Sequence, residues 1–254
     1  MGDPVIDAFI AARDAPRPHR PPSAERRLDV AEAYRLQDRL RETLTARGER
    51  VAGWKVGFTT RALQHANEVD EPVSAFLLAS GVFLTGAEVP ARRFLAVAVE
   101  AEVALVMRRE LAGPGVTAAQ ALLAVEGALP ALELIDFRYE GKYVGTDVIA
   151  EGVFASAIVL GAALRPIAEL DLALEGLVYE HNGAVVATNT AAEVMGNPLN
   201  SLAWLANHLG ARGLGLRPGD VVMTGSVSKI LRPAAGDIVR ATYTRLGSVG
   251  VRFA

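Results

Sequence analysis

Hydrophobic positions recur at helical spacing in the first 48 residues of the chain. Residues 4–13 predict a short amphipathic helix, and residues 29–48 predict a longer helix that begins at Asp29 and ends at Gly48. The proline-rich residues 15–22 separate the two helices, because proline lacks a backbone N–H and restricts the residue before it. We therefore expect residues 1–48 to form a helical N-terminal region that packs on a main domain of residues 49–254.

Short extended segments with glycine turns dominate the rest of the chain. Helical patterns interrupt them over residues 117–128 and from Asn197 to about residue 208, and Asn182-Gly183 has the pattern of a hairpin turn within residues 171–190. Strands and helices do not alternate regularly, which argues against a Rossmann fold or a TIM barrel. The other predicted extended segments are residues 50–60, 76–90, 94–107, 130–139, 147–161, 218–226 and 236–253.

The composition excludes several classes of function. Hydrophobic residues make up 51% of the 254 residues and charged residues 22%, which is typical of a globular protein. A net charge of −3 gives no electrostatic basis for binding nucleic acid. Because cysteine is absent, disulfides, thiolate zinc sites and cysteine nucleophiles are excluded. The N-terminus lacks the pattern of a signal peptide or a membrane span, so we expect a cytoplasmic protein with no membrane partner.

Two glutamates lie in an otherwise apolar strand, residues 96–106. Side chains of a strand alternate between its faces, so Glu100 and Glu102 project to the same side. A buried ionised carboxylate is costly unless it is paired or binds a metal, and two like charges this close must share a proton or a cation. The alternative is a half-exposed edge strand whose glutamates face water.

A third carboxylate, Glu133, has similar apolar surroundings in residues 129–136. Three oxygen ligands without cysteine or a nearby histidine suit a hard cation, Mg²⁺ or Mn²⁺. The spacing does not show whether Glu133 meets the other two glutamates in space.

Lys55 lies between Gly53 and Gly57 in a predicted strand, where glycine permits close approach of a ligand. This lysine is a candidate to hold a substrate carboxylate, or to act as a base if burial lowers its pKa; the alternative is a surface lysine. The small residues 224–226 follow a strand and form either a pocket wall or a turn. Arg138 and Lys142, near Tyr139 and Tyr143, are candidates to bind an anion, but we expect them to be solvated loop residues.

Taken together, these residues resemble a known family. The chain is similar to the 2-keto-4-pentenoate hydratase/4-oxalocrotonate decarboxylase family, within the fumarylacetoacetate hydrolase superfamily. The matching segments occur in family order and cover most of the chain: residues 53–60, 99–107, 130–139, 196–210, 218–226 and 236–253.

The resemblance implies an α+β fold, with a mixed, strongly bent β-roll of the fumarylacetoacetate hydrolase C-terminal type, surrounding helices and the helical N-terminal region. It implies that Glu100, Glu102 and Glu133 bind a divalent metal, usually Mg²⁺, and that Lys55 lies over the metal and contacts the substrate. It also implies a homo-oligomer, with a complex with a related hydratase or decarboxylase as a further option. The substrate-binding residues are then Lys55, Phe154, Thr224, Gly225 and Ser226.

The chain departs from the family pattern at three places. Family hydratases typically carry an aspartate immediately after the proline in the segment that reads Asp70-Glu71-Pro72-Val73 here, and the apolar Val73 favours decarboxylation. Asp70 and Glu71 are the candidates to replace that acid. Small polar pocket residues of the family are replaced in the segment of residues 150–155, where Phe154 is bulky, and Ser226 stands where decarboxylases often have glycine.

We therefore expect a divalent-metal-dependent lyase. The main expectation is a hydratase that acts on a 2-hydroxy-2,4-dienoate or 2-oxo acid through a metal-stabilised enolate. The alternatives are a 4-oxalocrotonate-type decarboxylase, a family variant with a larger substrate, and a non-catalytic partner subunit.

Overall fold

The computed structural model describes residues 3–168 and 170–254 and contains twelve strands and six α-helices within these ranges. The strands are β1 (Val51–Gly57), β2 (Val73–Leu78), β3 (Val82–Leu84), β4 (Ala87–Val89), β5 (Val97–Met107), β6 (Val125–Asp136), β7 (Ala155–Leu160), β8 (Gly176–His181), β9 (Ala184–Thr190), β10 (Val221–Ser226), β11 (Ile238–Tyr243) and β12 (Gly247–Phe253). The helices are α1 (Pro4–Asp14), α2 (Val30–Ala46), α3 (Arg61–Ala66), α4 (Ala118–Ala124), α5 (Gly145–Ala150) and α6 (Pro198–Ala211).

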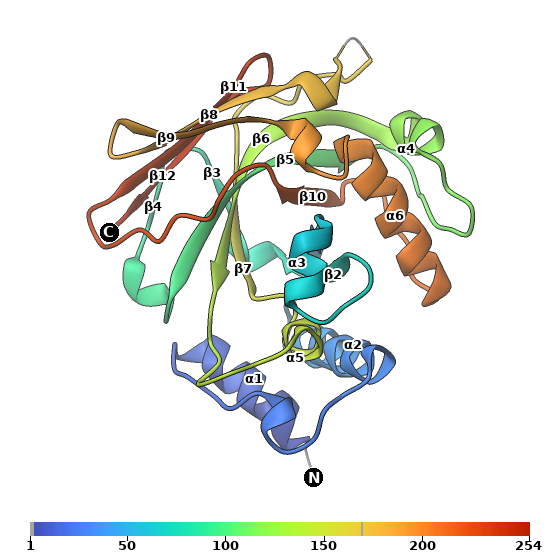
Figure 1. The fold of residues 1–254 in the computed structure, drawn as a ribbon, viewed down its shortest axis with the longest axis vertical. Coiled ribbons are helices and arrows are strands. Elements are labelled where there is room, and N and C mark those ends of the chain that lie inside the picture. The colour runs from blue at the N-terminus through green and yellow to red at the C-terminus, as the bar shows by residue number, and fades with distance from the viewer. Residues whose placement is uncertain (1–2, 169) are drawn as a thin grey trace.

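Two mixed sheets form the centre of the molecule (Figure 1). The seven-stranded sheet has the order β2-β1-β10-β5-β6-β7-β3, and the five-stranded sheet has the order β4-β12-β11-β8-β9. Strands β11 and β12 pack against β6, so the sheets bury a common core. Both faces of β5 and β6 are covered, and this explains why their sequences are almost continuously apolar.

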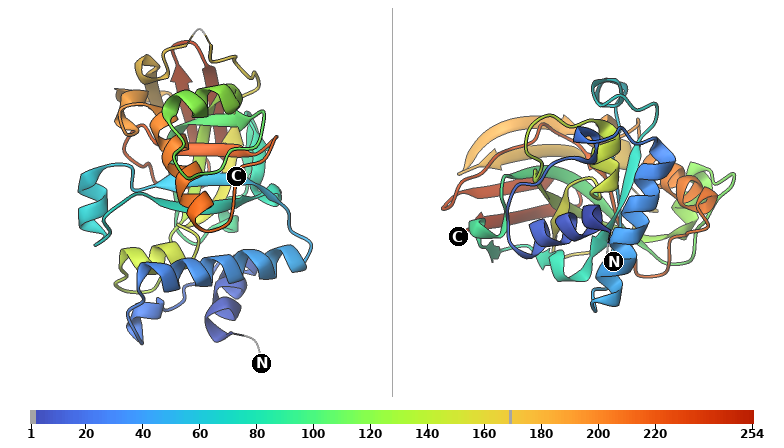
Figure 2. Two further views of the ribbon diagram at one scale, coloured as in Figure 1. Left: turned by 90° about the vertical axis from the view of Figure 1, so that its right-hand side faces the viewer. Right: turned by 90° about the horizontal axis from the view of Figure 1, so that it is seen from below.

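The helices lie in two groups around the sheets. Helices α4 and α6 pack against each other beside β10, on the right of Figure 1. Helices α1, α2 and α5 form a layer at the lower end of the molecule, and the turned views show α2 and α5 side by side (Figure 2). The N-terminal helices therefore contact the segment that joins β6 to β7. The domain boundary at residue 48 stays a prediction.

The longer N-terminal helix begins as its sequence predicts. The carboxylate of Asp29 accepts a hydrogen bond from the backbone N–H of Glu32, and the Glu32 carboxylate accepts one from the N–H of Asp29, which completes a capping box. The hairpin prediction is also confirmed, because Asn182 and Gly183 both have positive φ, 52° and 78°, between β8 and β9.

Two predicted elements differ from the observed ones. The helical pattern over residues 117–128 ends at Ala124, since Val125 pairs with Met107 at the start of β6. The expected extended run from residue 147 begins instead with α5, because the Asp147 carboxylate accepts hydrogen bonds from the N–H of Val144 and from Ser23. In both cases the observed element depends on a residue that is distant in the sequence: Val125 pairs with Met107, and Asp147 binds Ser23.

In the part of the chain that the structure describes, no helix combines the length and the apolar character that crossing a membrane requires.

Candidate active site

Three glutamates meet between the adjacent central strands β5 and β6. Glu100 and Glu102 project to one side of β5, as their spacing predicts, and Glu133 on β6 lies directly opposite Glu100 in the register. One carboxylate oxygen of each residue lies within 4.8 Å of those of the other two. Glu102 and Glu133 are buried, and Glu100 is partly buried. The structure therefore brings together the three residues that the sequence could not place relative to one another.

Lys55 reaches this cluster from β1. Its side chain is buried, and its Nζ lies 2.8 Å from Oε2 of Glu133 and 3.3 Å from the carbonyl oxygen of Val153. Strand β1 runs parallel to β10 at close range, with Gly53 opposite Val221. A Cβ at Gly53 would lie 1.9 Å from the carbonyl oxygen of Val221, so glycine is required for this approach. Lys55 is thus a buried cation rather than a surface lysine.

The charges of the cluster shift one another's pKa values. Burial alone lowers the pKa of Lys55, but Glu133, Glu100 and Glu102 raise it, and the net shift is upward. Burial raises the pKa of Glu100 to about 7, with Lys55 opposing and Glu133 reinforcing this change. Burial, Glu133 and Glu100 raise the pKa of Glu102 well above its usual range. The lysine is therefore an ammonium at neutral pH, and the carboxylates hold protons more tightly than free glutamate does.

The donor set fits a hard divalent cation. Oε1 of Glu133 is buried and has no hydrogen-bond partner among the described residues. Three carboxylates face one ammonium, so the ionised cluster retains excess negative charge. Oxygen ligands without nitrogen or sulfur are those that Mg²⁺ and Mn²⁺ prefer. The three glutamates could therefore hold a metal ion.

The predicted residues 224–226 border the cluster at the end of β10. The backbone N–H of Gly225 donates a hydrogen bond of 2.8 Å to Oε2 of Glu102. The hydroxyl of Thr224 donates to the carbonyl oxygen of Val103 and is buried, so it is engaged by the sheet. Ser226 is partly buried and donates to the carbonyl oxygen of Ser228. Of the three, Gly225 makes the contact with a cluster glutamate.

Phe154 belongs to an aromatic group beside the site. Its ring centroid lies 5.0 Å from that of Phe137, 5.6 Å from that of Tyr139 and 5.4 Å from that of Tyr143. The side chain is buried, and the residue directly follows Val153, whose carbonyl faces Lys55.

Asp70 and Glu71 lie on the surface, and the carboxylates that raise the pKa of Lys55 are the three cluster glutamates. The Glu71 carboxylate accepts a hydrogen bond from the indole N–H of Trp204. Val73 is buried in β2 opposite Gly57, and a Cβ at Gly57 would contact the side chains of Val73 and Val153. The wall that Val73 and Val153 form beside Gly57, two residues after Lys55 on β1, is therefore apolar.

Sequence reasoning missed a second buried ionic group, and its expectation for Arg138 was wrong. Arg138 is buried rather than solvated, and it pairs with Asp136 at 3.3 Å and with Glu151 at 2.6 Å. The spacing of Asp136 and Arg138 on one face of a strand was the available signal. Glu151, which follows α5 as its C-cap residue, joins them through its ion pair with Arg138.

The chain belongs to the fumarylacetoacetate (FAA) hydrolase C-terminal family, whose model matches residues 49–254. This confirms the family resemblance and the α+β fold that the sequence implied.

Individual relatives show which enzymes of this family resemble the chain. The 4-oxalocrotonate decarboxylase of Pseudomonas putida is 33% identical over 254 residues, which span 100% of this chain and 95% of that protein. The 2-oxo-hept-4-ene-1,7-dioate hydratase of Escherichia coli is 32% identical over 89% of this chain and 87% of that protein. The structure of 4-oxalocrotonate decarboxylase from Pseudomonas putida G7, complexed with magnesium and adipate, matches with a TM-score of 0.95 at 30% identity and covers 98% of this chain and 96% of that one. The relatives thus include both hydratases and a decarboxylase.

Metal binding at the three glutamates is expected to weaken as the pH falls. Because Glu100 has a pKa of about 7 and must be ionised to act as a ligand, Mg²⁺ affinity should fall about tenfold from pH 8 to pH 6. Isothermal titration calorimetry in two buffers of different ionisation enthalpy measures the affinity and the protons released. The Glu100→Gln variant should bind more weakly and release fewer protons on binding, and the pH dependence that remains should come from Glu102, whose pKa is also raised. A constant wild-type affinity without proton release would contradict this assignment.

Proposed function

We propose that the protein is a divalent-metal-dependent lyase of 2-oxo acids, with Glu100, Glu102 and Glu133 as metal ligands and Lys55 as the catalytic cation. The observation that carries the proposal is the buried contact of Lys55 with Glu133, inside a carboxylate cluster that retains excess negative charge. Mg²⁺ is the proposed metal, because the donor set is all oxygen and the matching decarboxylase structure contains magnesium; Mn²⁺ is the alternative.

A divalent ion at these glutamates would act as a Lewis acid toward the oxygens of a 2-oxo acid. Lys55 contributes a proton at Nζ and a fixed positive charge, since its pKa is raised and it starts as an ammonium. A cationic donor at this position stabilises negative charge that develops on a substrate oxygen. Its role as an acid, rather than as a base, follows from the same charges that raise its pKa.

Of the two lyase reactions, the surroundings of Lys55 favour decarboxylation. Loss of CO₂ from 4-oxalocrotonate breaks the bond to the distal carboxyl carbon, and the electron pair moves through the conjugated chain to the 2-oxo oxygen, which takes a proton. That sequence needs a cation and one proton donor. The apolar wall of Val73 and Val153 beside Gly57, on the same strand as Lys55, supplies no acid or base for activating water. The structural match to 4-oxalocrotonate decarboxylase, with a TM-score of 0.95 at 30% identity, supports the same choice.

Hydration of a 2-hydroxy-2,4-dienoate is the second candidate, because several hydratases match at similar identity. In that reaction Asp70 or Glu71 would have to move from the surface toward Lys55. Phe154, Thr224, Gly225 and Ser226 remain the proposed substrate-binding residues, with Gly225 supported best, through its contact with Glu102. A homo-oligomer and a complex with a related hydratase or decarboxylase remain predictions.

A direct assay separates the two reactions. The protein is given 4-oxalocrotonate and, separately, 2-hydroxypenta-2,4-dienoate, each with Mg²⁺ or with EDTA, and products are identified by NMR. We expect Mg²⁺-dependent CO₂ release from 4-oxalocrotonate. Conversion of the dienoate alone would make the protein a hydratase, and turnover that persists in EDTA would refute the metal-dependent proposal.

Replacing Lys55 tests its catalytic role. Lys55→Met should lower kcat/KM roughly a hundredfold or more, because the proton donor and the charge at Nζ are lost. Mg²⁺ binding should persist, since the three glutamates remain. Lys142→Met, at an exposed lysine, is the matched control and should behave as the wild type. Unchanged kcat/KM in the Lys55 variant would remove Lys55 from the mechanism.

Restoring an acid at position 73 tests what selects the reaction. Val73→Asp should raise hydration relative to CO₂ release, because a carboxylate near Lys55 can take a proton from water. Val73→Asn is the isosteric control without the charge and should leave the ratio unchanged. Product ratios from the NMR assay decide the outcome, and an equal ratio in both variants would show that position 73 does not select the reaction.

A further inference from the structure

The turn that carries the carbonyl partner of Lys55 has an unusual backbone. Gly152, Val153 and Phe154 have consecutive positive φ angles of 89°, 52° and 55°. The left-handed region is uncommon for residues with a side chain, and a β-branched residue such as Val153 is an outlier there. A strained conformation of this kind persists only where the surrounding structure holds it. The contacts that stabilise this turn therefore also fix the position of the Val153 carbonyl.

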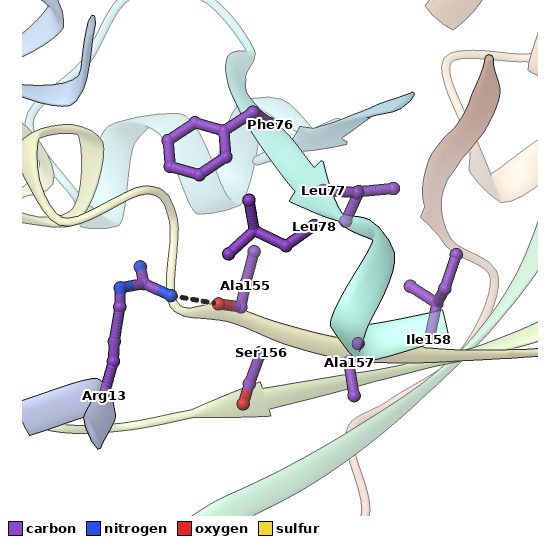
Figure 3. A pocket seen from close by; sticks show the side chains of 9 residues that line it. Arg13, Phe76, Leu77, Leu78, Ala155, Ser156, Ala157 and Ile158 are labelled. Carbon is purple, nitrogen blue, oxygen red and sulfur yellow. Dashed lines mark hydrogen bonds between the residues drawn. The ribbon is translucent and has the colours of Figure 1, made fainter. Parts of the chain in front are cut away.

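Arg13, on the last turn of α1, clamps both ends of the turn. Its Nη1 donates a hydrogen bond of 3.0 Å to the carbonyl oxygen of Ala155, as Figure 3 shows, and its Nη2 donates one of 2.6 Å to the carbonyl oxygen of Glu151. One planar guanidinium thus bridges the carbonyls on either side of the three left-handed residues. A fork of fixed geometry suits this task, whereas an ammonium does not.

The second buried ionic group holds Arg13 in place. The carboxylate of Glu151 lies 3.3 Å from Arg13 and 2.6 Å from Arg138, and Arg138 also pairs with Asp136 at the end of β6. The side chains of Glu151, Arg138 and Asp136 are buried, so the group is shielded from solvent. The backbone N–H of Asp136 further donates to the carbonyl oxygen of Phe154. The turn is therefore tied both to the N-terminal helix and to the strand that carries Glu133.

At its other side the turn faces the catalytic cluster. The carbonyl oxygen of Val153 accepts a hydrogen bond of 3.3 Å from Nζ of Lys55, whose remaining contact is with Glu133. A shift of the turn would change the direction in which the ammonium is held. Among the described residues, the polar contacts of Arg13 are with Ala155 and Glu151 and not with the three glutamates, so the proposed metal ligands would be unaffected.

We propose that Arg13 is a positioning residue: by bridging the carbonyls of Glu151 and Ala155 it holds the left-handed turn that orients Lys55. The N-terminal helix α1 thereby acts on the reaction through the backbone of another region. The inference rests on the proposed function of Lys55, and it assigns to residues 1–48 a role beyond covering the core.

The test compares Arg13→Ala and Arg13→Lys with Arg47→Ala. Arg47 pairs with Asp14 beside the same end of α1, at 2.8 Å, and does not touch the turn, so its variant is a matched control. Three quantities are measured for each: kcat and KM for 4-oxalocrotonate, Mg²⁺ affinity, and hydrogen–deuterium exchange of the peptide that spans residues 148–158. The Arg13→Lys variant keeps a positive charge beside Glu151, so it keeps the test usable if Arg13→Ala fails to fold.

Both Arg13 variants should lower kcat roughly tenfold to a hundredfold, as expected for a displaced catalytic group, with KM and Mg²⁺ affinity within about twofold of wild type. Exchange in the turn should accelerate in both, and Arg47→Ala should match the wild type. Restoration of kcat by lysine would reduce Arg13 to a charge partner and overturn the proposal. Equal losses in Arg47→Ala would overturn it as well.

The exchange measurement is independent of turnover. If the wild type converts no substrate, the proposed function fails, yet the clamp is still decided. Faster exchange in both Arg13 variants alone supports the clamp, and unchanged exchange overturns it.

Discussion

The burial of three carboxylates between two apolar strands is the constraint on which the rest of the structure depends. Ionised carboxylates lose hydration when they are buried, and at this spacing they also repel one another, so the cluster requires positive charge. Lys55 provides part of that charge from β1, and the raised pKa values of Glu100 and Glu102 mean that these carboxylates take up protons more readily than free glutamate does. A divalent ion would satisfy the same need. The excess negative charge that makes this cluster costly to bury is therefore the same property that would bind a divalent ion.

The scaffold delivers the positive charge through close backbone approaches. Strand β1 comes near enough to β10 only because residue 53 has no side chain, and the N–H of Gly225 contacts Glu102 directly. A second buried ionic group, formed by Arg13, Asp136, Arg138 and Glu151, lies next to the first and is close to electrically balanced. The two groups differ in charge: the second has two arginines for two carboxylates, and its Arg13 bonds the backbone of the turn, whereas the first has one ammonium for three carboxylates. The left-handed turn around Val153 connects them.

Relatives of this chain include hydratases and a decarboxylase on one scaffold, and the groups around Lys55 offer a reason. Under the proposed function, the glutamate cluster and the ammonium would serve any reaction that develops charge on a 2-oxo acid oxygen. What differs between the reactions is whether a second acid or base can reach the substrate. In this chain, Val73 and Val153 form an apolar wall beside Gly57, two residues after Lys55 on β1, and Asp70 and Glu71 lie on the surface. Under the proposed function, the choice between the two reactions would therefore depend on this wall and not on the three glutamates.

The sequence by itself determined the main helices, the hairpin at Asn182, the shared face of Glu100 and Glu102, and the family, because these depend on local periodicity or on motifs in fixed order. It did not determine that Glu133 lies opposite Glu100, since strand register is set by the whole sheet. Nor did it determine that Arg138 is buried or that α5 begins where it does: both depend on partners from the N-terminal region, Arg13 through Glu151 and Ser23 through Asp147. Only the tertiary structure brought these distant residues together, because long-range ion pairs leave no periodic trace in a chain.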